Sequence, residues 1–354
     1  MDINTTLFKA LQNSHFFYFD DYSKINEFLF FEGDFFSRRK YGEEIIENIL
    51  ANNGKKRLVS SIVQMGKIEY GTRGLKEWAR DHVVHALLTF ILGIYINEKF
   101  LFDQKECFVD TFQWKIASLF HDIGYPLEIA NSICGQYKKT INSIITDITN
   151  NGNNNNPVNI SISKRNINSL DKNKTCYGYI YECLRKWELD DTKIRKYVEN
   201  TGRNDHGVIS GITLLHIIDK MYSKHNPNRE ERDIYIDGDI NCNQKYFLED
   251  IIPSCSAIFV HNLPEECFTN KKILYNKAPL AFLLRLSDTL QEWERPSIQN
   301  EKGYSSKDFD ILIDKDKRLI FQAKFPNEAN REYLEMSDVL SKILGSKDII
   351  IEPV

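Results

Sequence analysis

Residues 117–126 read Ala-Ser-Leu-Phe-His-Asp-Ile-Gly-Tyr-Pro. The spacing of apolar residues predicts a buried helix over Cys107–Ile123, and the glycine and proline that follow are typical of a helix end. A protonated His121 would suit the negative end of that helix, but the carboxylate of Asp122 would not. An ordinary helix end is the alternative interpretation, and it leaves this mismatch unexplained. The pair therefore favours a functional role for both side chains.

A second pair of histidines lies on an earlier helix. Apolar residues recur at helical spacing over Gly74–Asn97, which predicts a long helix that carries His82 and His85. Residues three apart share one helix face, so the two imidazoles can serve one site. For an isolated pair, simple packing on an amphipathic helix is the more common explanation.

Three further side chains complete a set of metal-ligand types. His206 opens a predicted helix, with Asp205 as its N-cap, and could be only a histidine near a cap. His261 ends the apolar run Ile251–Val260 and could be a satisfied core histidine. Asp288 lies in an apolar helix, Pro279–Trp293, where a buried carboxylate is costly unless a cation compensates it. The alternative interpretation is that Asp288 belongs to a stripe of charged residues that faces water. Imidazoles and carboxylates gathered together are the usual ligands of divalent transition metals.

Bulk properties exclude several classes of protein. With 354 residues and 42% hydrophobic content, the chain can bury a large core, and a net charge of -4 gives no cationic field for nucleic acid. Seven scattered cysteines form neither a disulfide framework nor a zinc-knuckle pattern, which indicates a reducing compartment. The start of the chain lacks the pattern of a signal peptide, and the longest apolar stretch, Ala86–Ile96, is too short to cross a bilayer. We expect a cytoplasmic protein that binds neither membrane nor nucleic acid.

The chain divides into three predicted sections. Residues 1–45 form an N-terminal helical section, and residues 46–300 form a helical domain that contains all the candidate ligands. The composition of residues 150–174 shifts to Asn, Ser and Lys, which predicts a low-complexity insert. Residues 301–354 form a small α+β appendage, with a hairpin over Asp308–Phe325, a short helix and a final strand. The fold class is therefore mainly α.

The order His85, His121-Asp122, Asp288 resembles the HD superfamily of metal-dependent phosphohydrolases. This resemblance covers about residues 75–296 and implies a helical-bundle core in which those residues bind one divalent ion. His206 and His261 are similar to the extra histidines of members with two metals, and in that arrangement Asp122 would bridge the ions. His85 is the preferred ligand on the first helix, and His82 is an added or alternative one.

The donor set indicates the chemistry to expect. Four imidazoles and two carboxylates suit one or two ions of Mn, Fe, Co, Ni or Zn better than Mg. We expect a metal-activated water to hydrolyse a phosphate ester, with a small phosphorylated substrate such as a nucleotide as the ligand. Catalytic roles fall to His121 and Asp122, and Arg80 and Arg285 are candidates for binding phosphate, although each could be a solvated surface charge. Glu128 either orders a metal-bound water or is simply exposed.

Two other functions stay open on the sequence alone. One is a nucleotide-sensing regulatory module that has the metal site but no turnover. The other is an oxygenase with a di-iron centre, since some HD-superfamily members with the same ligand order are of this kind. The sequence is compatible with a homo-oligomer and does not identify the substrate.

Overall fold

The computed structural model describes residues 2–19, 21–51, 82–128, 174–200, 205–236, 240–294, 304–325 and 331–353. The fold is mainly helical with a small sheet near the C-terminus, which confirms the predicted fold class. The predicted insert, Arg80 and the first part of the predicted helix over Gly74–Asn97 lie outside the described residues. A continuous cluster of buried apolar side chains runs through the N-terminal, central and C-terminal segments.

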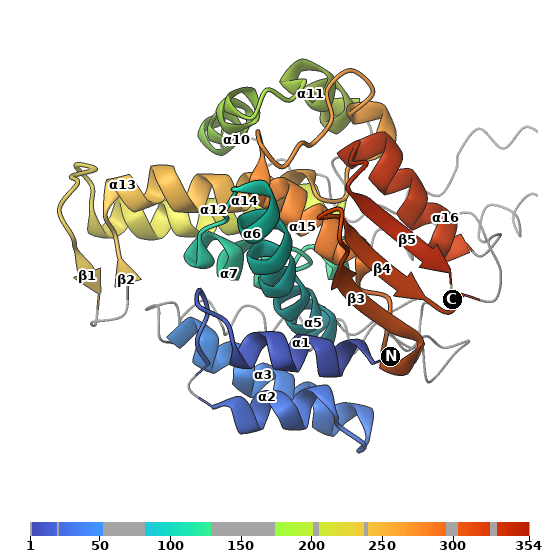
Figure 1. Cartoon of the computed structure of the whole chain (residues 1–354). Helices are drawn as coiled ribbons and strands as arrows, with labels where there is room; N and C mark the ends of the chain where they lie inside the picture. Colours follow the sequence, from blue (N-terminus) through green and yellow to red (C-terminus); the bar gives the residue numbers. More distant parts are fainter. Residues whose placement is uncertain are drawn as a thin grey trace, which may run out of the picture.

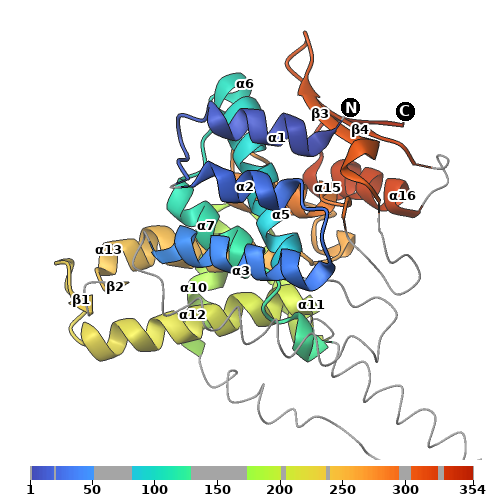
Figure 2. The ribbon, with the colours of Figure 1, turned by 90° about the horizontal axis from the view of Figure 1, so that it is seen from below.

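The N-terminal helices cover one side of a central helix (Figures 1 and 2). They are α1 (Ile3–Gln12), α2 (Tyr22–Leu29) and α3 (Phe35–Ala51). Asp2 and Asp21 cap α1 and α2, because each carboxylate accepts from backbone N–H groups of the first turn. This part of the chain is helical, and α3 continues beyond residue 45, where the first predicted section ends.

The central helix is α5 (His82–Tyr95), in which all residues after His82 are buried. It continues as a π-helical segment, Ile96–Phe102, and a short α6, Asp103–Lys105. This continuous stretch, His82–Lys105, is long and apolar enough to cross a membrane, but 89% of its most apolar window is buried inside the protein. Such burial is typical of the core helix of a soluble protein, because apolar neighbours cover it on every side.

Helix α7 (Thr111–Phe120) packs against α5 and leads directly into the His121-Asp122 pair. It starts four residues later than the predicted boundary at Cys107. Asp110 sets the start, because its carboxylate accepts from the backbone N–H groups of Phe112 and Gln113 at 2.8 and 3.2 Å.

Helices α12 (His206–His225) and α14 (Ile252–Val260) pack closely because glycines line their contact. A Cβ on Gly211 would lie 2.6 Å from the Cys255 carbonyl oxygen of α14, so only glycine permits this approach. Helix α10 (Lys174–Lys186) packs against both members of this pair, and α15 (Pro279–Leu290) packs against α14 and α5. The chain also forms α11 (Asp191–Asn200), a short α13 (Gln244–Tyr246), a π-helical segment (Phe247–Ile251), a 3-10 turn (Glu265–Cys267) and a small hairpin of β1 (Tyr235–Ile236) and β2 (Ile240–Asn241).

The C-terminal appendage is a three-stranded sheet with one helical crossover. A 3-10 turn, Ser306–Asp308, leads into β3 (Phe309–Ile313), which pairs antiparallel with β4 (Leu319–Ala323), so the predicted hairpin is confirmed. The chain then passes through α16 (Arg331–Asp338) and a π-helical segment, Val339–Leu344, before β5 (Ile349–Pro353) pairs parallel with β4.

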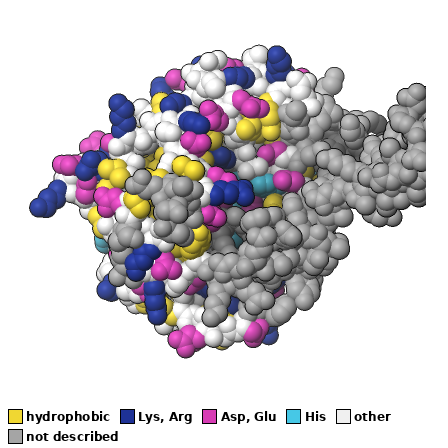
Figure 3. Space-filling model, turned by 90° about the vertical axis from the view of Figure 1, so that its right-hand side faces the viewer, with side chains coloured by type: hydrophobic (Ala, Val, Ile, Leu, Met, Phe, Trp, Pro, Cys, Tyr) yellow, Lys and Arg dark blue, Asp and Glu magenta, His cyan; other side chains and the backbone are white. Residues whose placement is uncertain are grey.

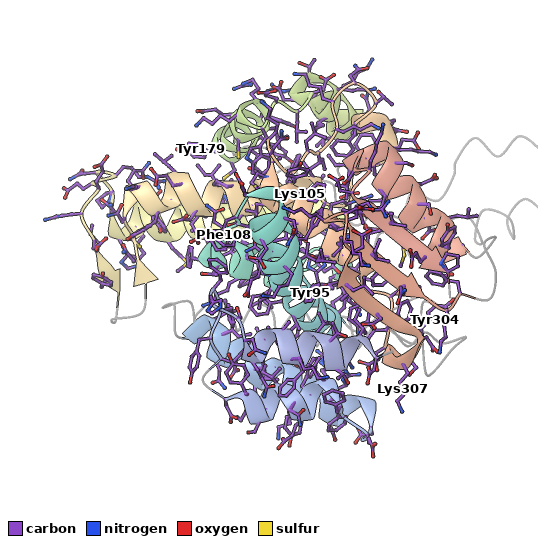
Figure 4. The ribbon with its side chains drawn as sticks, viewed as in Figure 1. Tyr95, Lys105, Phe108, Tyr179, Tyr304 and Lys307 are labelled. Atoms are coloured by element: carbon purple, nitrogen blue, oxygen red, sulfur yellow. The ribbon has the colours of Figure 1, made fainter. Side chains whose placement is uncertain are left out.

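Polar contacts attach this appendage to the helical core. Tyr95, labelled in Figure 4, donates its hydroxyl from α5 to the carbonyl oxygen of Ile311 at 3.4 Å. Lys105, also labelled there, forms an ion pair with Asp348 at 2.8 Å. These contacts place the appendage against the C-terminal end of α5 and against α6.

Replacing Gly93 by alanine is expected to destabilise the core by about 2 kcal/mol. A Cβ at Gly93 would lie 1.9 Å from the ring of Trp114, which is 1% exposed, so the ring would have to move. That movement would also disturb the hydrogen bond that Trp114 donates to the Phe90 carbonyl at 3.0 Å. Denaturant unfolding measures the change in the free energy of unfolding.

Gly178→Ala is the matched control, because nothing lies within 4 Å of a Cβ at that exposed position of α10. Its stability should rise by roughly 0.5–1 kcal/mol, since alanine favours the helix. Equal unfolding free energies for the two variants would contradict the described packing of Trp114.

Candidate metal centre

Five helix ends meet at one place and bring the predicted ligands together. His82 and His85 lie in the first turn of α5, His121 and Asp122 follow α7, and His206 opens α12. His261 follows α14, and Asp288 lies in the last turn of α15. Residues that are up to 206 positions apart in the sequence therefore share one site.

Asp122 stands at the centre of this site, with imidazoles on both sides of its carboxylate. Its Oδ2 atom lies 3.3 Å from His121 Nε2 and 3.4 Å from His82 Nε2. Its Oδ1 atom lies 3.3 Å from His206 Nε2 and 3.5 Å from His261 Nε2. Each oxygen thus faces a different group of nitrogen donors.

The Oδ2 side carries a second carboxylate and a close pair of imidazoles. His85 Nε2 lies 3.0 Å from Asp288 Oδ1 and 3.2 Å from His121 Nε2. Such separations are those expected of donors that share an ion at about 2.0–2.2 Å. The described residues contain three groups whose donor atoms all lie within 4.8 Å of one another, and these groups could hold a metal ion: His85, His121, Asp122; His121, His261, Asp288; and Asp122, His206, His261.

His82 belongs to none of those three groups. Its ring packs on Tyr125 with the ring centroids 4.1 Å apart, while its Nε2 faces Asp122. The structure thus places His82 beside the cluster and His85 within it.

Hydrogen bonds at Nδ1 orient the four clustered imidazoles. His121 and His261 donate from Nδ1 to the carbonyl oxygens of Ser118 and Ile258, at 2.7 and 2.6 Å. His206 Nδ1 lies 2.8 Å from a carboxylate oxygen of Glu128, which also accepts from the His206 backbone N–H at 3.0 Å. These oxygens can only accept, so Nδ1 carries the proton and Nε2 is left to bind a metal.

Gln291 orients His85 in the same way, with Nδ1 toward a hydrogen-bond acceptor and Nε2 toward the other ligands. Its Oε1 atom lies 2.5 Å from His85 Nδ1, and its own amide nitrogen donates to the Trp293 carbonyl at 2.7 Å. The second bond fixes which end of the amide faces the imidazole. Gln291 is fully buried, so this contact excludes water from the back of the ring.

The charges of the site favour a bound cation. Burial by itself raises the pKa of Asp122, but His121, His82, His261 and His206 hold that pKa well below its usual range. Burial lowers the pKa of His206, but its hydrogen bond to Glu128 and the charge of Asp122 raise that pKa to about 9. Burial likewise raises the pKa of Asp288, but His121 and His85 hold that pKa well below its usual range, so both carboxylates favour their charged form, which suits a divalent cation.

A buried nitrogen of His261 has no hydrogen-bond partner among the described residues. The Nε2 atom of His261 is inaccessible to solvent and points toward Asp122 without a hydrogen bond. An unsatisfied buried nitrogen is unfavourable unless another group completes it. A metal ion between His261, His206 and Asp122 would satisfy this atom, so the side chains fit the implied cofactor.

A cavity of about 550 Å³ opens over the cluster. Arg285 lines it one turn before Asp288, and the Nε atom of Arg285 is buried without a hydrogen-bond partner in the described part of the chain. Figure 3 shows histidine side chains that reach the surface beside basic and acidic ones on this face of the molecule. Asp288 is directed at His85 and His121, as a ligand would be, and 23% of its side chain is exposed toward the cavity.

Sequence reasoning missed two features of the site. It did not identify Gln291, although that residue follows Asp288 at helical spacing, because an amide carries no distinctive signal. It assigned Glu128 to a metal-bound water or to an exposed surface, whereas the structure pairs it with His206. Both contacts join distant segments and could be seen only in three dimensions.

Replacing Gln291 by alanine is expected to weaken metal binding by 10- to 100-fold, because His85 would lose the acceptor that orients it. Calorimetric titration of the metal-free protein with Mn²⁺ or Zn²⁺ measures this affinity. Gln291→Glu keeps an acceptor for His85 but loses the donor to the Trp293 carbonyl, so its metal affinity should be higher than that of Gln291→Ala.

Gln322→Ala is the control, because Gln322 lies on β4 and donates to Glu352 in the appendage. Unchanged affinity in Gln291→Ala would show that the contact to His85 does not orient the ligand.

Comparison of the chain with protein-family models, with curated proteins and with solved structures gave no match.

Proposed function

We propose that the cluster binds two divalent transition-metal ions and that the protein is a phosphohydrolase of the HD type. His85, His121, Asp122 and Asp288 would hold one ion, while Asp122, His206 and His261 would hold the other. This order of ligands along the chain is the one by which the sequence resembles the HD superfamily. The single observation that carries the proposal is the carboxylate of Asp122, whose two oxygens face separate groups of imidazoles.

The donor set narrows the choice of metal. Four of the six side chains offer imidazole nitrogen, which suits Mn, Fe, Co, Ni or Zn better than Mg, since Mg prefers oxygen ligands. Bound ions of this kind lower the pKa of a coordinated water and polarise a phosphoryl group.

The chain's own side chains would then serve binding and orientation. Arg285 would donate from its guanidinium to a phosphoryl oxygen, since a buried cation at the cavity wall is suited to an anion. Gln291 and Glu128 would hold the ligand imidazoles in place. In the reaction, water attacks phosphorus, the ester P–O bond breaks, and the leaving alkoxide takes up a proton, so one water gives one alcohol and one phosphate product.

A panel of phosphate esters tests this proposal. Protein loaded with each of Mn, Fe, Co, Ni and Zn should release phosphate or a phosphomonoester from at least one nucleotide or sugar phosphate. Oxygen consumption by the ferrous protein without phosphate release would instead support an oxygenase. Tight nucleotide binding with no turnover under any of these metals would support a regulatory module.

Replacing Arg285 by alanine should raise KM for the substrate by roughly 10- to 100-fold, because a hydrogen bond between charged groups contributes about 1.5–3 kcal/mol. Arg318→Ala is the control, since Arg318 pairs with Asp314 in the turn of the appendage. An unchanged KM in Arg285→Ala would remove the proposed role of this side chain.

A further inference from the structure

A relay of buried hydrogen bonds joins the N-terminal helices to a ligand of the metal centre. Gln291, whose Oε1 faces His85 Nδ1 at 2.5 Å, donates from its amide nitrogen to the Trp293 carbonyl at 2.7 Å. The indole N–H of Trp293 in turn donates to Oδ1 of Asn4, on α1, at 3.0 Å. Asn4, Gln291 and Trp293 are 0% exposed and His85 is 2% exposed, so bulk water does not compete for these bonds.

The segment that contains Trp293 takes its conformation from tertiary contacts. Glu294 has a φ of 56°, a left-handed conformation that residues other than glycine rarely adopt. Its carboxylate accepts from Asn4 Nδ2 at 3.1 Å and pairs with Arg38 of α3. The same Asn4 nitrogen donates to the carbonyl oxygen of Leu29, at the end of α2, at 2.7 Å. Helices α1, α2 and α3 therefore all contribute to fixing the backbone at Trp293.

The Trp293 carbonyl sets which end of the Gln291 amide faces His85. If that carbonyl moved away, the amide would be free to turn over and present its NH₂ group to His85 Nδ1. An NH₂ group only donates, so Nδ1 would then accept and the ring proton would lie on Nε2. A protonated Nε2 cannot bind a metal ion, so the orientation of this one amide sets the metal-binding form of the imidazole.

We infer that Asn4 and Trp293 are positioning residues for the metal ion that His85 binds. The N-terminal helices fix the Trp293 carbonyl, and that carbonyl holds Gln291 in the orientation that leaves His85 Nε2 available to the ion. The inference rests on the metal centre of the proposed function, but it does not depend on hydrolysis.

The relay serves one side of the centre. On the other side, His206 takes its orientation from Glu128, and His261 takes its orientation from the carbonyl oxygen of Ile258. Neither of these contacts includes a residue of the relay. A change in the relay should therefore weaken one ion and leave the other, whereas a general loss of folding would lower the binding of both.

Calorimetric titration of the full metal-free chain with Mn²⁺ tests the inference. Trp293→Phe keeps an aromatic ring but removes the indole N–H. It should weaken one of the two ions by about 5- to 10-fold, less than Gln291→Ala does, because its effect on His85 is indirect. Asn4→Leu removes the other end of the same hydrogen bond and should weaken the same ion by a similar factor. The second ion should bind with unchanged affinity in both variants.

Two double variants show whether the loss passes through Gln291 and His85. In the Gln291→Ala background, Trp293→Phe should cause no further loss, since the amide that it orients is gone. In the His85→Ala background, which should keep only the other ion, Trp293→Phe should leave the affinity for that ion unchanged. Trp114→Phe is the matched control, because Trp114 is 1% exposed and its indole donates to the Phe90 carbonyl at 3.0 Å. Both ions should bind to this control as they bind to the natural chain.

The outcomes separate this inference from the proposed function. Unchanged binding in Trp293→Phe and Asn4→Leu, equal weakening of both ions, additive losses in the Gln291→Ala background, or an equal loss in Trp114→Phe would overturn the inference. A natural chain that bound no metal would overturn both the metal centre and the inference. Selective weakening of one ion without any phosphate release would support the inference and overturn only the hydrolase.

Discussion

Replacement of Asp122 by alanine is expected to abolish the binding of both metal ions and to lower phosphate release by about 10²–10³-fold or more. Asp122 faces both groups of imidazoles, with one carboxylate oxygen for each. Without it, each ion would lose a ligand, and the charge that balances two cations would fall. Metal analysis of the purified and metal-reconstituted variant measures the first effect, and the phosphate-release assay measures the second.

Two comparisons make this result specific. Asp122→Asn has almost the same shape but no negative charge, so it should also lose metal while it keeps the fold. Asp103→Ala, an exposed change at the far end of the same core stretch as α5, should retain both ions. Full metal content in Asp122→Ala would show that the carboxylate bridges nothing.

Replacement of His261 by alanine is expected to remove one ion and leave the other. His261 contributes to the Oδ1 side of Asp122, together with His206, and its buried Nε2 atom has no hydrogen-bond partner among the described residues. The groups on the Oδ2 side, from His85, His121 and Asp288, stay in place. Metal content should therefore fall from two ions per chain to one, and phosphate release should fall about 100-fold or more, because a two-metal site clamps both oxygens of the displacement.

His85→Ala is the matched variant for the opposite side and should also leave one ion. Retention of two ions in His261→Ala, or the loss of both ions in each single variant, would contradict two separable sites. Circular dichroism of each variant shows whether the change is local, since both residues are buried.

Local patterns in the sequence predicted most of the elements but not their meeting point. The helices that carry His206 and Asp288 were predicted because their N-cap Asp205 and first-turn Pro279 are strong local signals. The hairpin of β3 and β4 was predicted from alternation around a polar turn. The start of α7 was wrong, because the apolar pattern was extended past the capping Asp110.

Three-dimensional packing decided what the sequence left open. His82 and His85 share a helix face, so spacing could not separate them, and the structure places only His85 within the donor groups. The approach of α12 to α14 depends on a missing side chain: a Cβ at Gly207 would lie 2.9 Å from His261 Nδ1. Likewise, side chains of α16 line the cavity beside the ligands, and no sequence pattern links α16 to those ligands.

An anomalous diffraction map of crystals of the natural chain loaded with Mn²⁺ would test the shared metal centre most directly. We expect two peaks, one on each side of the Asp122 carboxylate, separated by about 3.5–4 Å as in two-metal sites. One peak would lie beside His85, His121 and Asp288, and the other beside His206 and His261. The absence of any peak at this cluster, or a single peak that Asp122 does not contact, would contradict the claim that these six side chains form a shared metal centre.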